Sequence, residues 1–401
     1  MIGTEHDELD RIATGSAAPR FGEIVSRRLG EIGDRLNGRR VCVLGGAGSI
    51  GGRFAMDLLG FAPAEVLVCD KNENGLTDLT RDMRADPRSR AFGGKLEFFC
   101  LDVASPEMAD FLAAHGPEVI LNFAALKHVR TEKHLHSVRY MLRTNVMALR
   151  AIIADGALAR ARTLFSISTD KAASPANVMG ASKRLGEYVM GHGKAVHPDV
   201  FISSTRFANV AYSNGSILQS IVTRLRERQV FGVPARIRRY FISQAEASQI
   251  CLLSLLGEFD GGISIPREDL LAPDVPILDL ARSIVARHGY DPVEMRDEDE
   301  ARSALPGMVA SGRYPIVVTG GDTVGEKPQE VFHADFETAE PTREPALLRV
   351  PFPELPDWGR FDAALAACLD AGDMDGVLDA MGGIMPEFHH LGSHRHLDQG
   401  I

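Results

Sequence analysis

Long apolar runs are absent from this sequence of 401 residues. No stretch reaches the roughly 20 apolar residues that a membrane-spanning helix needs, so membrane insertion is not expected. The first residues, MIGTEHDELD, are acidic and contain no hydrophobic segment, which excludes a secretory signal peptide there. We therefore expect a cytoplasmic protein. Its net charge of −10 leaves no dense basic surface for phosphates, so nucleic acid is not an expected partner.

Cysteine is scarce, with five residues, and no two of them form a CxxC pair. Cys42, Cys69 and Cys100 lie in short apolar runs that predict buried strands. We expect the cysteines to be buried, reduced thiols. Near the C-terminal end, no neighbouring Cys or carboxylate completes a ligand set around the histidines, so we expect a solvated tail and no metal site. These histidines are His389, His390, His394 and His396.

The composition, 45% hydrophobic and 24% charged, is that of an ordinary globular protein. From Arg40 onward, short apolar runs alternate with helical patterns. This alternation predicts an α/β fold, a Rossmann-type doubly wound parallel sheet with a smaller substrate-binding domain. The predicted strands are Val41–Leu44, Glu65–Cys69, Leu96–Leu101, Val119–Phe123, Thr163–Ile167 and Val200–Ser203, and the helical segments between them include Gly52–Leu59, Gly75–Arg84 and Ser137–Ile153.

The same patterns divide the chain into four parts. Residues 1–38 form an N-terminal helical arm, in which Phe21–Leu36 has the spacing of an amphipathic helix that packs on the body or on a second subunit. Residues 39–205 form the dinucleotide-binding domain, with 240–257 packing back on it. Residues 206–355 form the substrate domain, and 356–401 form a C-terminal helical segment and tail. We expect a homo-oligomer.

A glycine-rich turn follows the first predicted strand. Gly45, Gly48 and Gly51 stand between a strand and a helix, and an acidic residue follows about 20 positions later. Gly45 permits a tight turn, Gly48 lets the backbone approach a pyrophosphate, and Gly51 allows close contact between helix and strand. The helix N-terminus at Ser49 and Ile50 offers unpaired N–H groups and a positive dipole end to phosphates. This context predicts a dinucleotide site.

Residues at the ends of the following strands bear on which dinucleotide binds. Asp70 ends the second strand, where a carboxylate accepts hydrogen bonds from a ribose and repels a 2′-phosphate, which favours NAD. Lys71 could instead bind that phosphate, so NADP remains an alternative. Asp102 and Val103, after the third strand, are placed to meet the adenine. Further cofactor contacts are expected at Ala124, Ala125, Lys127 and Asn145, although Asn145 could equally be a polar cap.

Groups suited to acid–base chemistry follow the fifth predicted strand. Thr169, Asp170 and Lys171 come directly after it, and Met179 and Lys183 lie a helical turn apart a few residues later. This segment resembles the Tyr-x-x-x-Lys motif of short-chain dehydrogenases. In that motif the lysine holds the nicotinamide ribose and lowers the pKa of the tyrosine. Here the lysine is Lys183 and the tyrosine position is Met179, which cannot accept a hydroxyl proton.

Several longer sequence runs resemble a particular enzyme family. SISTDKAASPANVMGASKR, NFAALKHV, RFANVAYSNGS, RRYFISQAEASQ, ISIPR and GEKPQE resemble the UDP-N-acetylglucosamine 4,6-dehydratases, extended short-chain dehydrogenases/reductases that act in capsule, flagellar-sugar and nonulosonic-acid synthesis. DKNENGLTDLTRDMR and LKHVRTEK are most similar to the legionaminic-acid-type variety. The resemblance runs from about Arg40 to Glu330, and methionine at the tyrosine position is similar to a variant within this group. Ala208 and Asn214 depart from the pattern of many relatives, which have Gly and Arg there.

The resemblance implies a reaction and roles for its residues. Oxidation at C4 of the sugar acidifies the C5 proton, a base removes that proton while an acid protonates the departing 6-hydroxyl, and hydride returns to C6. Asp170 is implied as the acid and Lys171 as the base, and Thr169 could hydrogen-bond the C4 oxygen. Lys171 must then be neutral and Asp170 protonated. Because Met179 lacks a phenol, we expect Asp170, Lys171 or an ordered water to accept the C4 hydroxyl proton.

Substrate contacts are expected at the carboxyl edge of the sheet and in the second domain. Lys127 and His128 follow the fourth strand at that edge. Four polar or basic residues are expected to contact the nucleotide diphosphate, since Arg and Lys suit phosphate oxygens, with a water-facing role as the alternative for each. They are Arg206, Asn209, Arg239 and Lys327.

Two other functions compete with a dehydratase. A nucleotide-sugar 4-epimerase or 4-ketoreductase would use the same cofactor and substrate class, but the adjacent Asp170 and Lys171 count against it. A non-catalytic NAD-binding protein is supported by the missing tyrosine. The base of the nucleotide (uridine or guanosine) and the C5 stereochemistry of the product are left open by the sequence.

Overall fold

The apolar runs of the sequence form one large sheet in the computed structural model, which describes residues 7–128, 132, 134–154, 156–271, 274–320, 331–355 and 357–390. This sheet has nine strands in the order β15-β16-β11-β6-β5-β4-β1-β2-β3. All neighbours from β11 to β3 pair in parallel, whereas β16 and β15 are antiparallel additions at one edge. The strands are β1 Arg40–Leu44, β2 Glu65–Asp70, β3 Lys95–Cys100, β4 Val119–Asn122, β5 Thr163–Ile167, β6 Phe201–Thr205, β11 Gly262–Pro266, β15 Glu340–Pro341 and β16 Leu347–Pro351.

The strand order places the switch point of the sheet between β1 and β4. From β1 the chain proceeds outward to β2 and β3, and it then crosses back to β4 on the other side of β1. In doubly wound sheets, ligands bind in the crevice that this reversal opens at the carboxyl ends of the strands. All six predicted strands are present to within two residues, because β-branched and apolar runs bounded by turn residues are a local signal.

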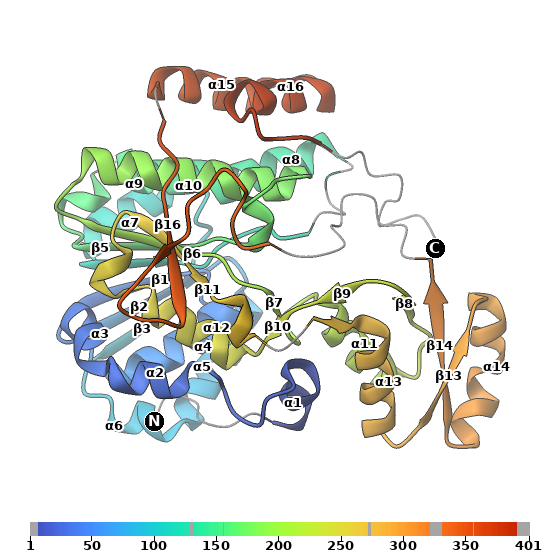
Figure 1. Cartoon of the computed structure of the whole chain (residues 1–401). Coiled ribbons are helices and arrows are strands. Elements are labelled where there is room, and N and C mark those ends of the chain that lie inside the picture. The colour runs from blue at the N-terminus through green and yellow to red at the C-terminus, as the bar shows by residue number, and fades with distance from the viewer. Residues whose placement is uncertain are drawn as a thin grey trace.

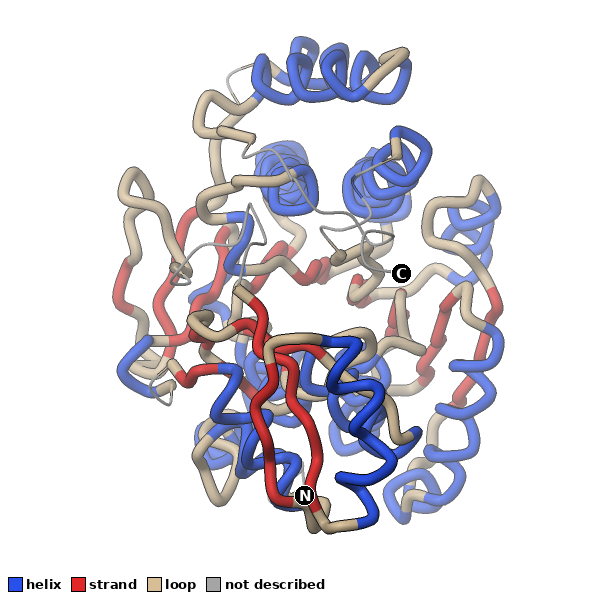
Figure 2. Tube along the Cα trace, turned by 90° about the vertical axis from the view of Figure 1, so that its right-hand side faces the viewer, coloured by secondary structure: helices blue, strands red, loops and turns tan. Residues whose placement is uncertain are grey.

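Helices cover both faces of this sheet (Figures 1 and 2). On one face lie α8, α9 and α10, and on the opposite face α12 packs against α4 and α2. The predicted helix Ser137–Ile153 is interrupted by a π-helical turn at Arg143–Met147, which separates α8 from α9. The helices of this unit are α2 Gly22–Arg27, α3 Leu29–Leu36, α4 Ser49–Leu58, α5 Glu73–Ala85, α6 Pro87–Ala91, α7 Glu107–His115, α8 Leu135–Leu142, α9 Ala148–Ala154, α10 Val178–Val196 and α12 Gln244–Leu253.

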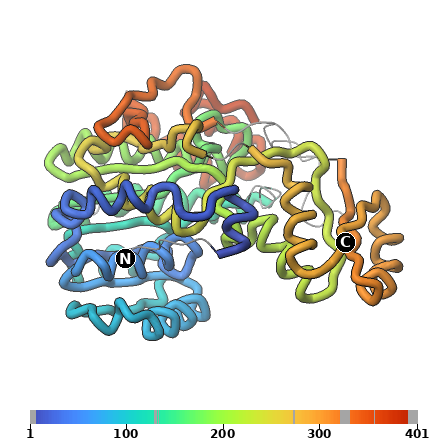
Figure 3. Tube along the Cα trace, turned by 60° about the horizontal axis from the view of Figure 1, so that its bottom comes forward, coloured from blue at the N-terminus to red at the C-terminus, as the bar shows by residue number. Residues whose placement is uncertain are grey.

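A second, smaller unit projects from the sheet (Figure 3). It has its own apolar core, in which Val233, Ala281, Ile284 and Tyr314 are fully buried. Within the stretch 206–355, β11, β15 and β16 belong to the large sheet, and α12, which lies in the segment 240–257 expected to pack back on the first domain, contacts α4 and α2. The parallel sheet of the smaller unit has the order β13-β14-β8, and its elements are β8 Gly232–Pro234, α11 Ile217–Glu227, α13 Ile277–Arg287, β13 Asp291–Met295, α14 Glu298–Ala310 and β14 Arg313–Thr319.

Short strand pairs join the two units. These pairs are β7 Asn209–Val210 with β10 Phe241–Ile242, and β9 Arg238–Arg239 with β12 Val275–Pro276.

The N-terminal arm packs on its own chain. Phe21, Ile32 and Leu36 are fully buried in the main core, as the amphipathic spacing requires. The predicted single helix is instead two, α2 and α3, which meet at Arg28. Before them, α1 (Glu8–Thr14) packs on the second unit, so the arm contacts both units.

The C-terminal segment forms the predicted helices, α15 (Trp358–Asp370) and α16 (Met374–Ile384). They form an outer layer over α8, α9 and α10 (Figures 1 and 2). Trp358 stacks on His192 of α10 with ring centroids 3.7 Å apart, and Asp362 pairs with Arg150 of α9. This contact fixes the pair of helices against the body.

The structure bears on two expectations drawn from composition, the buried cysteines and the absence of a membrane-spanning helix. The prediction of buried thiols is wrong for Cys100, which is exposed at the end of the outermost strand, whereas the other four cysteines are buried. Among the described residues, no helix is long and apolar enough to cross a bilayer.

Candidate active site

The glycine turn after β1, residues 45–51, is tightly packed, and it is called the glycine cradle below. Gly45 has φ +78°, a left-handed conformation that glycine adopts without strain. A Cβ at Gly45 would lie 2.5 Å from the backbone nitrogen of Ala124, and one at Gly51 would lie 2.3 Å from the carbonyl oxygen of Gly45. Glycine is therefore required at both positions for α4 to pack this closely on β1 and on the loop after β4.

The N-terminus of α4 is open to an anion. Gly48 is its N-cap, and within the described chain no side chain caps this helix. Unpaired N–H groups and the helix dipole make such an end a phosphate site. Ser49 opens the helix, and its Oγ accepts the backbone N–H of Asn214 (2.8 Å), which brings the loop after β7 to this site. These residues fit the pyrophosphate of a dinucleotide.

Asp70 fixes the cradle from the next strand. One carboxylate oxygen accepts the backbone N–H of Ala47, and the other accepts that of Asn72, both at 2.9 Å. Asn72 in turn caps α5 through the N–H of Gly75. A carboxylate has about four lone-pair positions, so Asp70 can still accept the hydroxyls of a ribose.

A tyrosine that the sequence did not single out joins the adenine side of this site. The hydroxyl of Tyr140 donates to Asp102 Oδ2 (2.7 Å) and accepts from Lys71 Nζ (2.5 Å). Lys71 also lies 4.4 Å from the centroid of the Tyr140 ring. Asp102 additionally accepts the N–H of Ala104, and Val103 between them is buried. Lys71 is therefore engaged by Tyr140, beside two carboxylates.

Asn145 lies in the π-helical turn and connects the loop after β4 to α10. Its Oδ1 accepts the N–H of Leu126, and its Nδ2 donates to the carbonyl of Leu126 and to Ser182 Oγ. The loop that holds Ala124, Ala125 and Lys127 is thus bound to the helix that carries Lys183. π-Helical turns of this kind often occur at functional sites.

The acid–base residues meet at the carboxyl end of β5. Lys171 Nζ lies 3.3 and 3.4 Å from the two carboxylate oxygens of Asp170, and Thr169 Oγ1 donates to Asp170 Oδ1 (2.7 Å). Asp170 is buried, whereas a third of the Lys171 side chain is exposed. The carboxyl, the amine and the hydroxyl thus form one contiguous polar group.

The start of α10 holds Met179 and Lys183 in different surroundings. Met179 is buried in the main core, where its side chain packs against apolar neighbours. Lys183 is also buried, and its Nζ donates to the carbonyl of Ile167 (3.0 Å). Burial lowers the pKa of Lys183 to about 8, partly opposed by Glu187.

Glu132, which sequence analysis passed over, caps α10. Its two carboxylate oxygens accept the N–H groups of Val178 (3.0 Å) and Met179 (2.7 Å). Burial raises the pKa of Glu132 to about 7, although these hydrogen bonds oppose the shift. No spacing rule marks this residue, because its partners lie about 46 residues along the chain.

Lys127 and His128 face the loop after β7. Lys127 Nζ donates to Ser213 Oγ (3.3 Å), and burial lowers the pKa of Lys127. A Cβ at Gly215, where φ is +74°, would lie 2.8 Å from the His128 ring. The structure therefore brings together the end of β4, the start of α4 and the segment 213–215.

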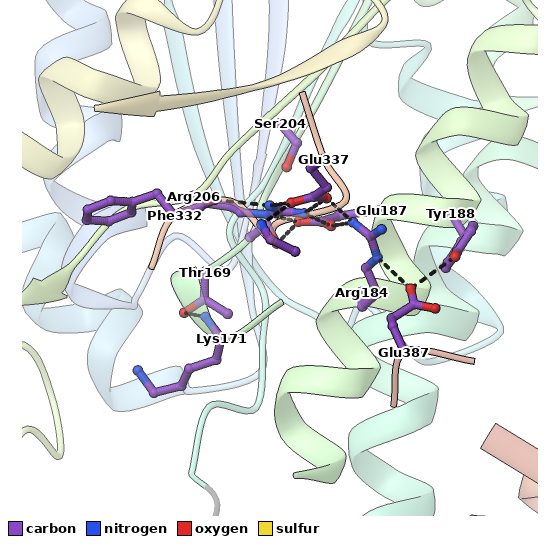
Figure 4. A network of polar contacts seen from close by, with 12 residues as sticks. Thr169, Lys171, Arg184, Glu187, Tyr188, Ser204, Arg206, Phe332, Glu337 and Glu387 are labelled. Atoms are coloured by element: carbon purple, nitrogen blue, oxygen red, sulfur yellow. Dashed lines mark hydrogen bonds and ion pairs between the residues drawn. The ribbon is translucent and has the colours of Figure 1, made fainter. Parts of the chain in front are cut away.

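The prediction that Arg206 contacts a diphosphate is wrong in this structure. Arg206 is fully buried, and its guanidinium donates five hydrogen bonds to Glu187, Glu337 and the carbonyl of Phe332. Figure 4 shows this cluster, in which Arg184, Tyr188 and Glu387 continue the chain of contacts. A guanidinium whose donors are all engaged by buried partners cannot reach a ligand.

Two further predicted substrate residues, Asn209 and Arg239, lie at the short strand pairs that join the two units. Asn209 begins β7 and donates to the carbonyl of Tyr240 (3.5 Å). Arg239 is buried in β9, and its Nη1 donates to the carbonyl of Arg238 (2.8 Å). Lys327 lies outside the described residues.

Comparison with known proteins identifies the family. Residues 41–351 match the family described as polysaccharide biosynthesis protein. The chain belongs to this family. The probable polysaccharide biosynthesis protein EpsC of Bacillus subtilis is 29% identical over 265 residues, which are 65% of this chain and 42% of that protein. The chain therefore spans less than half the length of this relative.

More distant relatives carry two different activities in their names. The inverting UDP-N-acetylglucosamine 4,6-dehydratase of Campylobacter jejuni is 23% identical over 266 residues, 65% of this chain and 75% of that protein. A UDP-glucose 4-epimerase of Rickettsia conorii is 24% identical over 232 residues, 57% of this chain and 66% of that protein.

A solved structure shares the fold. The dTDP-glucose 4,6-dehydratase DesIV of Streptomyces venezuelae, solved with NAD and TYD bound, superposes with a TM-score of 0.55 at 20% identity, over 74% of this chain and 88% of that one. At this identity the likeness shows the fold alone: an α/β sheet with a small second unit.

Proposed function

We propose that this protein is an NAD-dependent nucleotide-sugar 4,6-dehydratase of polysaccharide biosynthesis. The observation that carries the proposal is the contact of Asp170 and Lys171 at the carboxyl end of β5, two strands from the glycine cradle of β1. An elimination of water needs one acid and one base on the same substrate, and this pair supplies both. The family and the dehydratases among the relatives support the same reaction.

The cofactor proposal is NAD rather than NADP. Gly45, Gly48 and the open start of α4 fit a dinucleotide pyrophosphate, and Asp70 fits the ribose. A 2′-phosphate would meet the carboxylates of Asp70 and Asp102, while Lys71 is held by Tyr140. When bound, the nicotinamide would take hydride from C4 and return it at C6.

The Asp170–Lys171 contact offers a simple way to prepare both groups. At neutral pH an ordinary carboxyl group is charged and an ordinary amine carries its proton. Moving one proton from Lys171 to Asp170 produces a carboxylic acid and a neutral amine without a change in total charge. The acid can then protonate the departing 6-hydroxyl while the amine removes the C5 proton, and the Lys171 ammonium returns a proton to C5 when hydride arrives at C6.

The C4 hydroxyl proton needs another acceptor than a phenol. Met179 is buried and has no exchangeable proton, so we assign this step to the Asp170–Lys171 pair or to a water that it holds, and this proton passes on to solvent before Lys171 removes the C5 proton. Thr169, which already donates to Asp170, is positioned to hydrogen-bond the C4 oxygen in place of that contact. Lys183 would hold the nicotinamide ribose while its proton remains bound.

We propose UDP-N-acetylglucosamine as the substrate, on the strength of the C. jejuni relative and of the motifs of the sequence. The legionaminic-acid-type variety is the finer assignment, and it rests on the segments DKNENGLTDLTRDMR and LKHVRTEK.

Product identification tests the proposal. The protein would be incubated with NAD and UDP-N-acetylglucosamine, and the sugar followed by proton NMR. A dehydratase yields a 4-keto sugar with a 6-methyl signal, which also absorbs in alkali. An epimer at C4 that retains its 6-hydroxymethyl group would establish a 4-epimerase instead, and binding of NAD without any product would indicate a non-catalytic protein.

A further inference from the structure

Glu187 is a buried carboxylate for which the proposed reaction provides no role. It lies on α10 one turn after Lys183 and is 2% exposed. Its Oε1 accepts from Ser168 Oγ (2.6 Å) and Arg206 Nε (2.7 Å), and its Oε2 accepts from Arg206 Nη2 (2.6 Å) and Arg184 Nη1 (3.2 Å). These four hydrogen bonds, three of them from the guanidinium groups of Arg206 and Arg184, fix the carboxylate in place.

Ser168 is the residue between β5 and the catalytic turn. Its backbone N–H donates to the carbonyl of Thr205 in β6 (2.9 Å), so its main chain continues the sheet. Its side chain reaches across to α10 and ends on Glu187. The next residues are Thr169, Asp170 and Lys171, and a displacement of Ser168 would therefore move the acid–base pair.

Glu187 also faces Lys183. A small cavity of about 10 Å³ is lined by both residues together with Asn122, Asn145 and Ser168. These polar side chains thus border one shared space beneath the catalytic turn. Within it the charge of Glu187 raises the pKa of Lys183, against the larger lowering by burial.

We propose that Glu187 is a positioning residue, which holds the Thr169–Lys171 turn through Ser168 and keeps the Lys183 ammonium in place from the same helix. This role rests on the proposed function, since it concerns the geometry of that site. Arg206 and Glu337 complete the arrangement: Arg206 orients the Glu187 carboxylate with two hydrogen bonds, and Glu337 neutralises the remaining side of the guanidinium. In Figure 4 the cluster lies directly beside Thr169 and Lys171.

The most selective variant is Ser168→Ala, because it removes the link and leaves the ionic cluster intact. We expect kcat to fall roughly 10-fold, as for a misplaced catalytic group, with KM changed less than about twofold. Tyr188→Phe is the matched control. It removes a hydrogen bond of the same cluster, from Tyr188 Oη to Glu387 (3.1 Å), that leads away from the catalytic turn. We expect this control to leave kcat unchanged.

The pH dependence of Glu187→Gln distinguishes a positioning role of Glu187 from a role in packing alone. The amide can still accept from Ser168 but carries no charge, so the pKa of Lys183 should fall. Because Lys183 binds ribose in its protonated form, activity is lost as pH rises through that pKa. The alkaline limb of the kcat/KM profile should therefore move to lower pH in Glu187→Gln and stay in place in Tyr188→Phe.

Hydrogen exchange measured by mass spectrometry gives a readout that does not need turnover. We expect Ser168→Ala and Glu187→Gln to increase deuterium uptake in the peptide that covers residues 168–172, and Tyr188→Phe to leave it unchanged. Equal uptake in all four proteins would overturn the positioning role, even in a chain that forms no product. A wild-type chain without product but with the expected exchange pattern would instead contradict the proposed function alone.

Discussion

Two groups of opposite charges lie side by side at the end of β5, and they differ in how tightly they are held. In the catalytic pair, Lys171 lies 3.3 Å from Asp170 and a third of its side chain is exposed. In the buried cluster, Arg206 is fully covered and lies 2.6 Å from Glu187 and 2.7 Å from Glu337. An amine such as that of Lys171 can give up its proton, whereas a guanidinium such as that of Arg206 keeps it.

The difference follows from the chemistry of the cations. A guanidinium keeps its proton at any physiological pH, and its planar fork suits carboxylates on two sides. An amine loses its proton more readily when burial or a reaction demands it. In the proposed mechanism, permanent charges hold this site together, while a charge that can be neutralised performs the reaction.

The largest expected effect is on activity, at the catalytic pair. Asp170→Asn and Lys171→Met should each lower kcat about 10³-fold, the range that general acid–base groups contribute. Their melting temperatures should stay close to that of the wild type, since Lys171 is partly exposed and makes long contacts. Single-turnover kinetics and thermal unfolding would measure the two properties. A variant of this pair whose melting temperature falls strongly would contradict the distinction between a catalytic pair and a stabilising cluster.

In the buried cluster, by contrast, the main expected effect of a substitution is on folding stability. Arg206→Met leaves the carboxylates of Glu187 and Glu337 buried without their main partner, which should cost about 3–5 kcal/mol of unfolding free energy. Denaturant unfolding would measure it. Arg238→Met serves as control, because Arg238 pairs with Asp274 at an exposed site and should cost less than about 1 kcal/mol.

Glu337 makes the contribution of this cluster to folding stability dependent on pH in the acidic range. Its neighbours Arg206 and Arg184 outweigh the effect of burial and lower its pKa to about 2. A lowered pKa stabilises the fold by about 3 kcal/mol above the usual carboxyl pKa of 4.5, and the contribution disappears as pH falls through 2. The stability difference between wild type and Glu337→Gln should therefore shrink between pH 4.5 and 2. A difference that is independent of pH in that window would contradict the ionic role.

The smallest expected effect concerns the cofactor. Tyr140→Phe removes the hydroxyl that engages Lys71 and Asp102, so Lys71 becomes available to a 2′-phosphate. We expect NADP affinity to rise a few-fold while NAD affinity changes little, as measured by calorimetric titration of both cofactors. Lys71→Ala in the same background should abolish the gain, and its persistence would exclude Lys71 as the phosphate partner.

The fold and the cradle could be predicted because their signals are local. Strands β1, β2 and β4 are predominantly apolar runs, and Gly45 and Gly51 lie between a strand and a helix. Asp170 and Lys171 are neighbours in the chain, so their proximity needed no tertiary information.

Several of the errors and omissions concern partners that are distant in sequence. Arg206 resembled a phosphate ligand because its partner Glu337 lies 131 residues away. Glu132 and Tyr140 were missed for the same reason, as they meet Met179 and Asp102 through the fold alone. The break between α2 and α3 at Arg28 also had no counterpart in the hydrophobic spacing.

Turnover in deuterated water tests the central claim most directly. The sugar product of the wild-type chain should carry solvent deuterium at C5, whereas the hydrogen delivered to C6 should come from the substrate. The double variant Asp170→Asn/Lys171→Met should form no product and leave C5 unlabelled. Unchanged turnover by that variant, or a wild-type product without deuterium at C5, would contradict the assignment of elimination to this pair.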